Sequence, residues 1–345
     1  MVKNRKYHID MIKIFAIFMV IYNHTGDAGF LAYQQEGPVF LQMIQMIPSI
    51  VCKTAVPLFY MCTGALLLGK EENLKALWKN RVLKYIMILV GFTVLYYVFL
   101  SLRNQTPMNF WWILKTIYGT TTFSYSGAYW FLYSYIGFLI MLPFLRSIAR
   151  NLNKEQILYL IVINVFVRGI LPIAEILLQM ENLAVDMVLI TADVFFYPFM
   201  GYYIEKCAYE EVCNKKNMLG LFGMALLSVV TSGFFTFYYL YSDMPTQACL
   251  TLFGMFLVLF IYVGCKWICH EWKLNGKVAQ WISAVGGCSF GVYLIHGFLF
   301  TVLDDFFMKW EISISYGMAW IRTFIIFIIG SMMVWLFQKV RVLLK

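Results

Sequence analysis

Apolar side chains run along this chain in long stretches, and short polar connections separate the stretches. A run of about 20 mostly apolar residues is long enough to cross a bilayer as a helix. Because lipid cannot hydrogen-bond an exposed backbone, we expect every such run to be helical. Ten runs of this kind can be read from the sequence: 9–26, 47–69, 82–102, 129–146, 157–177, 187–204, 217–240, 246–265, 280–302 and 316–339. The pattern predicts an all-α polytopic membrane bundle with about ten transmembrane helices.

The composition agrees with this pattern. Hydrophobic residues make up 61% of the chain and charged residues only 13%, a balance that excludes an ordinary water-soluble domain. The connections are too short to fold as a separate soluble domain, so we expect a single integral membrane domain over residues 1–345. No small-residue cleavage site follows the first apolar run, which predicts a retained first helix rather than a secretory signal.

Lysine and arginine gather at both ends of the chain and in every second connection, and this asymmetry predicts the orientation of the bundle, since basic residues favour cytoplasmic loops. They are Lys3, Arg5, Lys6, Lys70, Lys75, Lys79, Arg81, Lys84, Arg146, Arg150, Lys154, Lys206, Lys215, Lys216, Lys266, Lys273, Lys277, Lys339, Arg341 and Lys345. The alternate connections carry mostly acidic residues: Asp27, Glu36, Glu181, Asp186, Asp243, Asp304, Asp305 and Glu311. We therefore expect both termini in the cytoplasm and a multi-pass protein of a bacterial inner or plasma membrane. The net charge of +9 follows from this sorting, so it predicts no nucleic-acid partner.

The cysteines do not indicate a metal site. The chain has eight, without a paired short-spacing motif. Cys265, Cys269 and His270 together supply too few ligands for zinc. We expect no metal, and we interpret most of the thiols as packing residues.

Proline and glycine interrupt several of the apolar runs. Pro57 lies in the second run and Pro198 in the sixth. Such breaks are tolerated in membrane helices where neighbours satisfy the freed backbone groups, and they often line cavities. The glycines of these helices allow a second interpretation, close helix packing through small residues. They are Gly64, Gly201, Gly286, Gly287 and Gly291.

The first apolar run carries three ionisable residues, Asp10, Lys13 and His24. At 100° per residue, the eleven steps from Lys13 to His24 return to within about 20° of the starting direction, so all three share one side of a helix. The rise of 1.5 Å per residue separates Lys13 from His24 by about 16 Å. Ionisable residues inside membranes are costly and often functional. The alternative is an interfacial pair of Asp10 and Lys13, with His24 only marking the helix end.

Five segments of the chain resemble, in order, the acyltransferase family 3 membrane proteins. They are IDMIKIFAIFMVIYNH, TAVPLFYMCTGALLL, YWFLYSYIGFLIMLPFLR, YPFMGYYIEK and SFGVYLIHGFLF. The family's first helix has an acidic residue, then a basic residue, ten intervening residues and a histidine. This chain departs from the family pattern at Lys13, where arginine is usual, at Thr63, where serine is usual, and at Ala128, where many relatives have histidine. Lysine cannot make the bidentate fork of arginine.

The resemblance implies transfer of an acyl group, acetyl first of all, from an acyl-CoA donor such as acetyl-CoA. The expected acceptor is a hydroxyl or amino group of a surface polysaccharide or glycolipid. His24 is expected to act as general base, since the unperturbed pKa of imidazole is about 6.5. Lys13, with Arg81 and Lys84, is expected to hold the CoA phosphates or to polarise the thioester. Asp10 would position Lys13.

Two further residues are candidates for the catalytic group. Asp27 follows His24 at the i+3 position and could orient its imidazole. His296 lies about as far along its helix as His24 does, so the two could face one cavity. The alternative for His296 is a buried histidine bonded to a backbone carbonyl. The remaining ionisable residues in or beside the apolar runs could form structural ion pairs, and they are Arg168, Glu175, Asp193 and Arg322.

The sequence also allows functions without acyl transfer. A transporter or flippase for a lipid-linked sugar or small metabolite would use helices broken at Pro57 and Pro198 and the embedded charges as a pathway. A receptor without turnover is less favoured by the short connections.

Overall fold

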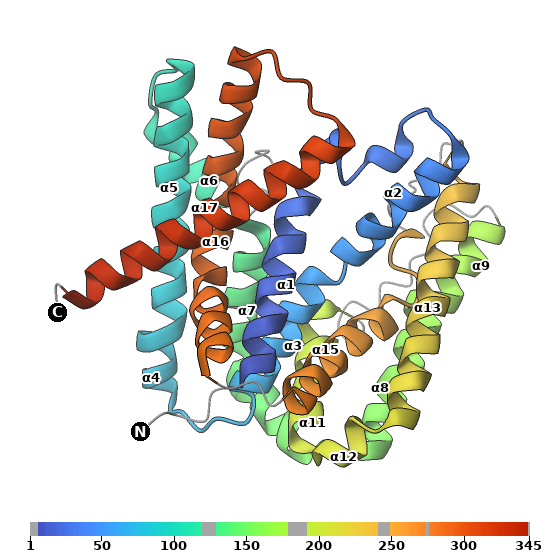
Figure 1. Ribbon diagram of the computed structural model, residues 1–345. Coiled ribbons are helices and arrows are strands. Elements are labelled where there is room, and N and C mark those ends of the chain that lie inside the picture. The colour runs from blue at the N-terminus through green and yellow to red at the C-terminus, as the bar shows by residue number, and fades with distance from the viewer. Residues whose placement is uncertain (1–5, 119–128, 179–191, 241–248, 273–275, 344–345) are drawn as a thin grey trace.

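The computed structural model describes residues 6–118, 129–178, 192–240, 249–272 and 276–343. Within these ranges the chain is helical and has no strand, which confirms the predicted all-α bundle. Figure 1 shows the N-terminus, α4 (Leu74–Leu77) and α12 (Tyr209–Val212) at the same end of this bundle. Residues of the predicted charge and family patterns that fall outside the described ranges are Lys3, Arg5, Ala128, Glu181, Asp186, Asp243, Lys273 and Lys345.

Eight helical stretches of the described chain are long and apolar enough to cross a membrane. One combines α2 (Val39–Cys52) with α3 (Ala55–Leu67), another α4 with η3 (Trp78–Val82) and α5 (Leu83–Asn104), and a third α8 (Lys154–Val165) with η5 (Phe166–Ile170) and α9 (Leu171–Leu177). The others are single helices: α7 (Trp130–Asn151), α13 (Lys215–Tyr238), α15 (Gly254–Glu271), α16 (Gly276–Lys309) and α17 (Tyr316–Leu343). A short helix, α6 (Phe110–Tyr118), follows α5.

The two other predicted spans correspond to α1 (Tyr7–Asn23), of 17 residues, and to α11 (Asp193–Lys206), of 14 residues. Both are shorter than each of the eight stretches above, the shortest of which has 18 residues. The helix α1 packs against α3, α15, α16 and α17, and its Ile12, Ile17 and Ile21 are fully buried. The total of about ten spans and the cytoplasmic location of the termini stay predictions. What the structure adds is that the helix with the predicted site lies at the centre of the bundle (Figure 1).

A break at Lys53 and Thr54 separates α2 from α3, where the sequence predicted one run. Pro57 explains it, because the proline ring clashes with the carbonyl four residues earlier, that of Lys53, and has no N–H to offer it. Pro198 has a different outcome. It lies within α11, which continues through it, so the expected break at this position is wrong.

Glycines bring α3 and α11 into backbone contact. A Cβ atom on Gly64 would lie 1.9 Å from the carbonyl oxygen of Pro198, and one on Gly201 would lie 2.1 Å from that of Met61. On α16, a Cβ atom on Gly286 would lie 2.6 Å from the Cβ of Asp10. No side chain fits at these crossings, so the close-packing interpretation is confirmed for these glycines.

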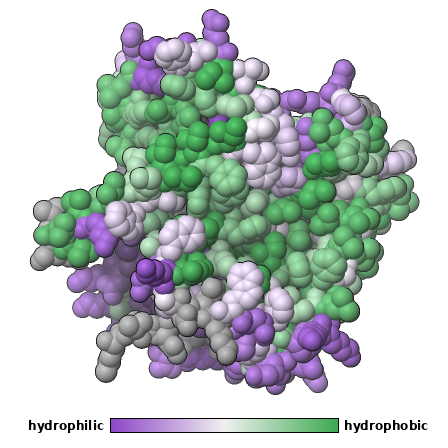
Figure 2. Space-filling view, in the orientation of Figure 1, coloured by the Kyte–Doolittle hydropathy of each residue, from purple (hydrophilic) through white to green (hydrophobic). Residues whose placement is uncertain are grey.

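The outer surface is the kind that lipid requires. Large apolar side chains such as Phe40, Trp111 and Leu219 are at least 70% exposed. Figure 2 shows hydrophobic residues across the middle of one face and hydrophilic residues toward its two ends. A water-soluble protein rarely exposes so much contiguous apolar surface, whereas a bilayer covers it.

One end of the bundle, which we name the basic end, carries Lys6, Lys79, Arg81, Lys206 and Lys215 beside the N-terminus, α4 and α12 (Figure 1). Here the carboxylate of Glu205 on α11 accepts from Lys6 at 2.5 Å and lies 2.9 Å from His8 Nε2 and 3.4 Å from Lys266 Nζ. These contacts tie α1, α11 and α15 together. They fix the helix that carries Lys13 and His24 at its basic end.

Candidate active site

A cavity of about 670 Å³ lies inside the bundle. Its walls come from α1, α3, α5, α7, α11 and α16, helices far apart in sequence. Several aromatic side chains line it, so a large part of its surface is apolar: Phe59, Tyr85, Trp130, Phe131, Tyr135, Phe290 and Tyr293. The volume lies within the usual range for a small-molecule or cofactor site.

The polar side of α1 faces this cavity. Lys13 and His24 both line it, about 16 Å apart along the helix axis by the rise per residue. Asp10 is buried and its carboxylate lies 3.6 Å from Lys13 Nζ. The structure thus confirms that Lys13 and His24 share one side of the helix, while Asp10 is not among the residues that line the cavity. Asp10 forms the expected i,i+3 pair with Lys13, whose side chain lines the cavity.

The imidazole of His24 is held in one orientation by the backbone. The helix α1 ends at Asn23, and the Nδ1 of His24, the next residue, lies 2.7 Å from the carbonyl oxygen of Val20. A carbonyl only accepts, so in neutral imidazole Nδ1 carries the proton and Nε2 keeps its lone pair. His24 is therefore a proton acceptor with a cavity in front of it.

His296 lies directly behind His24. The two ring centroids are 5.0 Å apart and the rings meet edge to face. His296 is 1% exposed, does not line the cavity, and its Nδ1 lies 2.6 Å from the Tyr293 carbonyl oxygen. Its geometry is that of the alternative considered above, a buried histidine bonded to the backbone. The expectation that both histidines face the cavity is wrong, while a catalytic role for His296 stays a prediction.

The structure does not bring Asp27 to His24. Asp27 lies exposed in a short helix, η1 (Gly26–Ala28), beyond the end of α1. The i+3 argument needs a continuous helix, and the chain leaves α1 before it reaches Asp27. The hydrogen bond of His24 Nδ1 goes to Val20 instead. The prediction that Asp27 orients the imidazole of His24 is therefore wrong.

Cations line the cavity toward the basic end. Lys13, Lys70 and Arg81 all contribute to its wall. Arg81 Nε lies 2.8 Å from the carboxylate of Glu72, which also accepts from Arg146 at 3.2 Å. Partial burial alone would raise the pKa of Glu72, but the hydrogen bonds and charges of these two guanidinium groups outweigh it and lower that pKa below its usual value.

Two residues differ from expectation in this region. Lys84 is exposed and lies over the ring of Tyr85, 5.8 Å from its centroid, outside the cavity wall. Lys70, which sequence reasoning used only for orientation, lines the cavity instead. The structure therefore favours Lys70 over Lys84 as a partner of Lys13 and Arg81.

Sequence reasoning also missed Lys53, whose side chain lines the same cavity at the break between α2 and α3. The sequence contains a signal for this residue. Lys53 lies four positions before Pro57, and the proline leaves the carbonyl of that residue without its helical hydrogen bond. Asp193 and Thr251 line the cavity nearby. Within the described residues no group of three or more histidine, cysteine or acidic side chains is arranged to hold a metal ion.

The apolar outer surface and the long apolar helices are those of an integral membrane protein, and its cavity is lined by both aromatic and charged side chains. Comparison with known proteins defines the class further. A family model described as an acyltransferase domain, that of acyltransferase family 3, matches residues 6–337, and the chain belongs to this family. The family and the long apolar helices together make the chain a multi-pass membrane protein of an acyltransferase family.

One relative is a protein named amino-acid racemase from Enterococcus faecalis, 33% identical over 158 residues. The match covers 44% of this chain and 21% of the relative, so the chain spans about a fifth of that protein's length. No solved structure matches the chain.

Proposed function

We propose that this protein transfers an acyl group, acetyl in the first instance, from acyl-CoA to a hydroxyl or amino group of a surface polysaccharide or glycolipid. The observation that carries the proposal is the single cavity with cations toward its basic end and the His24 imidazole farther along α1. The family supports acyl transfer, and the lining of the cavity suits a long donor with an anionic head and an uncharged arm.

Lys13, Lys70 and Arg81 suit the donor's phosphates, since charge-assisted hydrogen bonds to phosphate are among the stronger polar contacts. The pantetheine arm would follow the wall of aromatic side chains away from these cations. The separation of about 16 Å between Lys13 and His24 lets the two residues serve different parts of one extended donor. Asp10, bound to Lys13, would keep its ammonium group in place.

His24 would act as general base in the chemical step. The acceptor oxygen or nitrogen attacks the thioester carbonyl carbon while its proton passes to His24 Nε2. The tetrahedral intermediate then breaks its carbon–sulfur bond, and the imidazolium returns the proton to the departing sulfur, so that free CoA leaves. The acceptor gains the acyl group and loses one hydrogen, and the step needs no oxidant or reductant. The bond from Nδ1 to Val20 holds the required tautomer.

A second function, transport of a lipid-linked sugar or small metabolite, draws on the helix break at Lys53 and on the charged residues beside it. Membership of an acyltransferase family favours the enzyme. The two functions can be distinguished by mass, because transport leaves the mass of the cargo unchanged and acyl transfer increases the mass of the acceptor.

Mass spectrometry of cell-surface glycans, with and without the gene, tests the proposal. Acyl transfer predicts that one acyl unit disappears from a glycan on deletion and returns with the wild-type gene but not with a His24→Ala variant. Loss of an unmodified glycan from the surface would instead indicate transport.

A further inference from the structure

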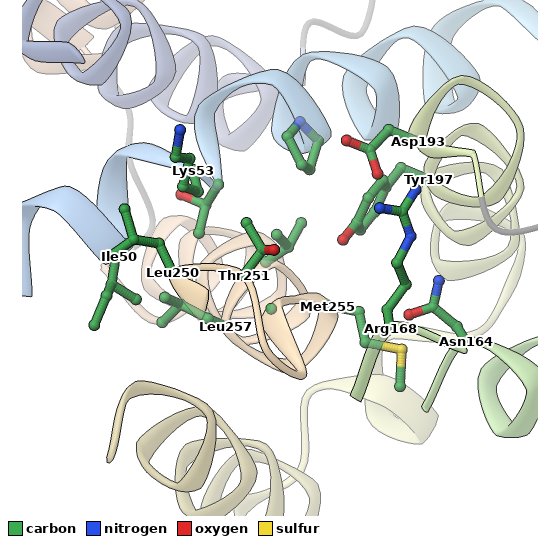
Figure 3. Close-up of a pocket in the computed structure, with 14 residues that line it drawn as sticks. Ile50, Lys53, Asn164, Arg168, Asp193, Tyr197, Leu250, Thr251, Met255 and Leu257 are labelled. Atoms are coloured by element: carbon green, nitrogen blue, oxygen red, sulfur yellow. The ribbon is translucent and has the colours of Figure 1, made fainter. Parts of the chain in front are cut away.

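A second, smaller pocket of about 70 Å³ opens beside the main cavity (Figure 3). The two share Lys53, Pro57, Asp193 and Thr251 in their walls, so they adjoin. The small pocket adds Arg168 and the buried amide of Asn164. Figure 3 shows Lys53 on one side of it and Asp193 and Arg168 on the other. The mechanism above uses none of these residues.

Lys53 is a basic side chain inside an apolar bundle. Its Nζ lies over the ring of Phe30, 4.7 Å from the centroid, and among the described residues no carboxylate oxygen lies within 4.0 Å of it. Charged side chains in a membrane interior are costly and normally pair or mark a ligand pathway. The ammonium group therefore points to an anion that is not part of the chain.

Arg168 is carried by an irregular piece of backbone. It lies in η5, a π-helical turn between α8 and α9, and its carbonyl oxygen accepts from the N–H of Phe253 at 3.3 Å. Phe253 itself has a φ of 54°, which side chains of this size rarely adopt. π-Helical turns and strained residues recur at functional sites, where the surrounding structure maintains them.

The charges of the pocket define the ligand. Lys53 and Arg168 bring two positive charges and Asp193 one negative charge, so the formal sum is +1. A single carboxylate neutralises this sum, whereas a phosphate monoester, with close to two negative charges, exceeds it. The planar guanidinium of an arginine also matches a carboxylate well.

The pocket lies within reach of the proposed base. Cys52 Sγ lies 3.8 Å from Met19 Sδ, which places the neighbouring Lys53 near the level of Met19 on α1. His24 is five residues farther along, about 8 Å by the helical rise. A sugar-sized molecule spans that distance.

From this geometry we infer that the pocket of Lys53, Arg168 and Asp193 binds a carboxylate of the acceptor, so that the acceptor is an acidic sugar or a similar hydroxy acid. The inference rests on the proposed acyl transfer and specifies its acceptor. Lys53 and Arg168 hold the carboxylate, and Asp193 accepts a hydrogen bond from a neighbouring hydroxyl group. The remainder of the acceptor extends along the main cavity to His24.

Binding of glucuronate, compared with glucose, tests this inference without any turnover. The purified full chain in detergent is heated in the presence of each compound, and the apparent Tm is followed against ligand concentration, because a ligand that binds the folded state raises the Tm. We expect glucuronate, but not glucose, to raise the Tm of the wild type. Lys53→Met should weaken this effect at least about tenfold, since a hydrogen bond to a charged group is lost.

Two further variants separate charge from folding. Lys53→Arg keeps the cation and should retain the response to glucuronate. Lys309→Met removes the same charge from an exposed position at the end of α16, outside both cavities, and should respond like the wild type.

Three results would overturn the inference: no response of the wild type to glucuronate, an undiminished response in Lys53→Met, or a stronger response to glucose 6-phosphate than to glucuronate. The proposed function fails separately. If glucuronate binds through Lys53 but no acyl group is ever transferred from acetyl-CoA, the acyl-transfer proposal fails while the carboxylate site stands. If acyl groups are transferred only to neutral acceptors and glucuronate has no effect, the carboxylate site fails while the acyl-transfer proposal stands.

Discussion

The imidazole rings of His24 and His296 meet edge to face with their centroids 5.0 Å apart, across the contact between α1 and α16. Each ring lies within hydrogen-bonding distance, through Nδ1, of a carbonyl of its own helix, Val20 or Tyr293. Both neutral rings therefore carry their proton on Nδ1. Of the two, only His24 lines the cavity. His296 thus packs against the ring of His24 from outside the cavity, and His24 is the histidine that the proposed mechanism uses.

Replacing His24 with alanine should reduce acyl transfer by about 10²- to 10⁴-fold, the usual contribution of a general base. The measurement is CoA release from acetyl-CoA in the presence of acceptor, with the elution volume on size exclusion as a check of folding. His270→Ala is the matched control, because this histidine is exposed at the end of α15, away from the cavity. Unchanged turnover in His24→Ala would remove the proposed base.

Lys13→Ala should raise the KM for acetyl-CoA about tenfold or more, with a smaller effect on kcat, because it removes a charged contact to the donor. Lys13→Arg keeps the charge in the cavity and should be tolerated. Initial rates against donor concentration measure both effects. Lys79→Ala, an exposed lysine at the same end of the bundle, is the control. A donor KM that stays at the wild-type value in Lys13→Ala would exclude the donor role.

The ion pairs of Glu72 predict a pH dependence of stability. The pKa of this carboxyl is lowered in the folded protein, so its contribution to stability is present above the unfolded pKa, near 4.5, and is lost as the pH falls through the folded value. Glu72→Gln should therefore lower the apparent Tm by a few degrees at pH 7 and by progressively less below about pH 4.5. Equal differences at pH 7 and at pH 4 would contradict this account.

The contact between α3 and α11 predicts that replacing a glycine with alanine destabilises the protein at this crossing but not elsewhere. Gly64→Ala places a methyl group 1.9 Å from the Pro198 carbonyl oxygen, so the helices must move apart, at a cost of about 1–3 kcal/mol. Gly91→Ala is the matched control, since no atom lies within 4 Å of the added carbon in the interior of α5. It should be neutral or stabilise by up to about 1 kcal/mol. Thermal unfolding in detergent compares the stability of the two variants. A similar loss of stability in both would contradict the close backbone contact between α3 and α11.

Much of the fold could be predicted from the sequence, because lipid imposes two strong constraints. Apolar length identifies the helices, and the need to satisfy every backbone group excludes other spanning structures. Helical arithmetic likewise placed Lys13 and His24 on one side of α1, and the structure confirms that both line one cavity. These features depend only on positions within a single helix.

The remaining features depend on contacts between helices, which a periodic pattern does not contain. His296 is directed behind His24 rather than into the cavity because of the packing of α1 on α16. Asp27 does not pair with His24 because α1 ends at Asn23, before the i+3 spacing can apply. The pocket of Lys53 and Arg168 forms where the α2–α3 stretch, the α8–α9 stretch, α11 and α15 meet, and the pattern of a single segment does not show that these stretches meet.

The central claim is that Lys13 and His24 serve the two ends of one bound acyl-CoA, and a cryo-EM map of the protein with CoA bound tests it most directly. The account predicts phosphate density beside Lys13, Lys70 or Arg81, a pantetheine arm along the aromatic wall, and the thiol close to His24. Density for CoA outside this cavity, or a cavity closed by packed side chains between the two residues, would contradict it.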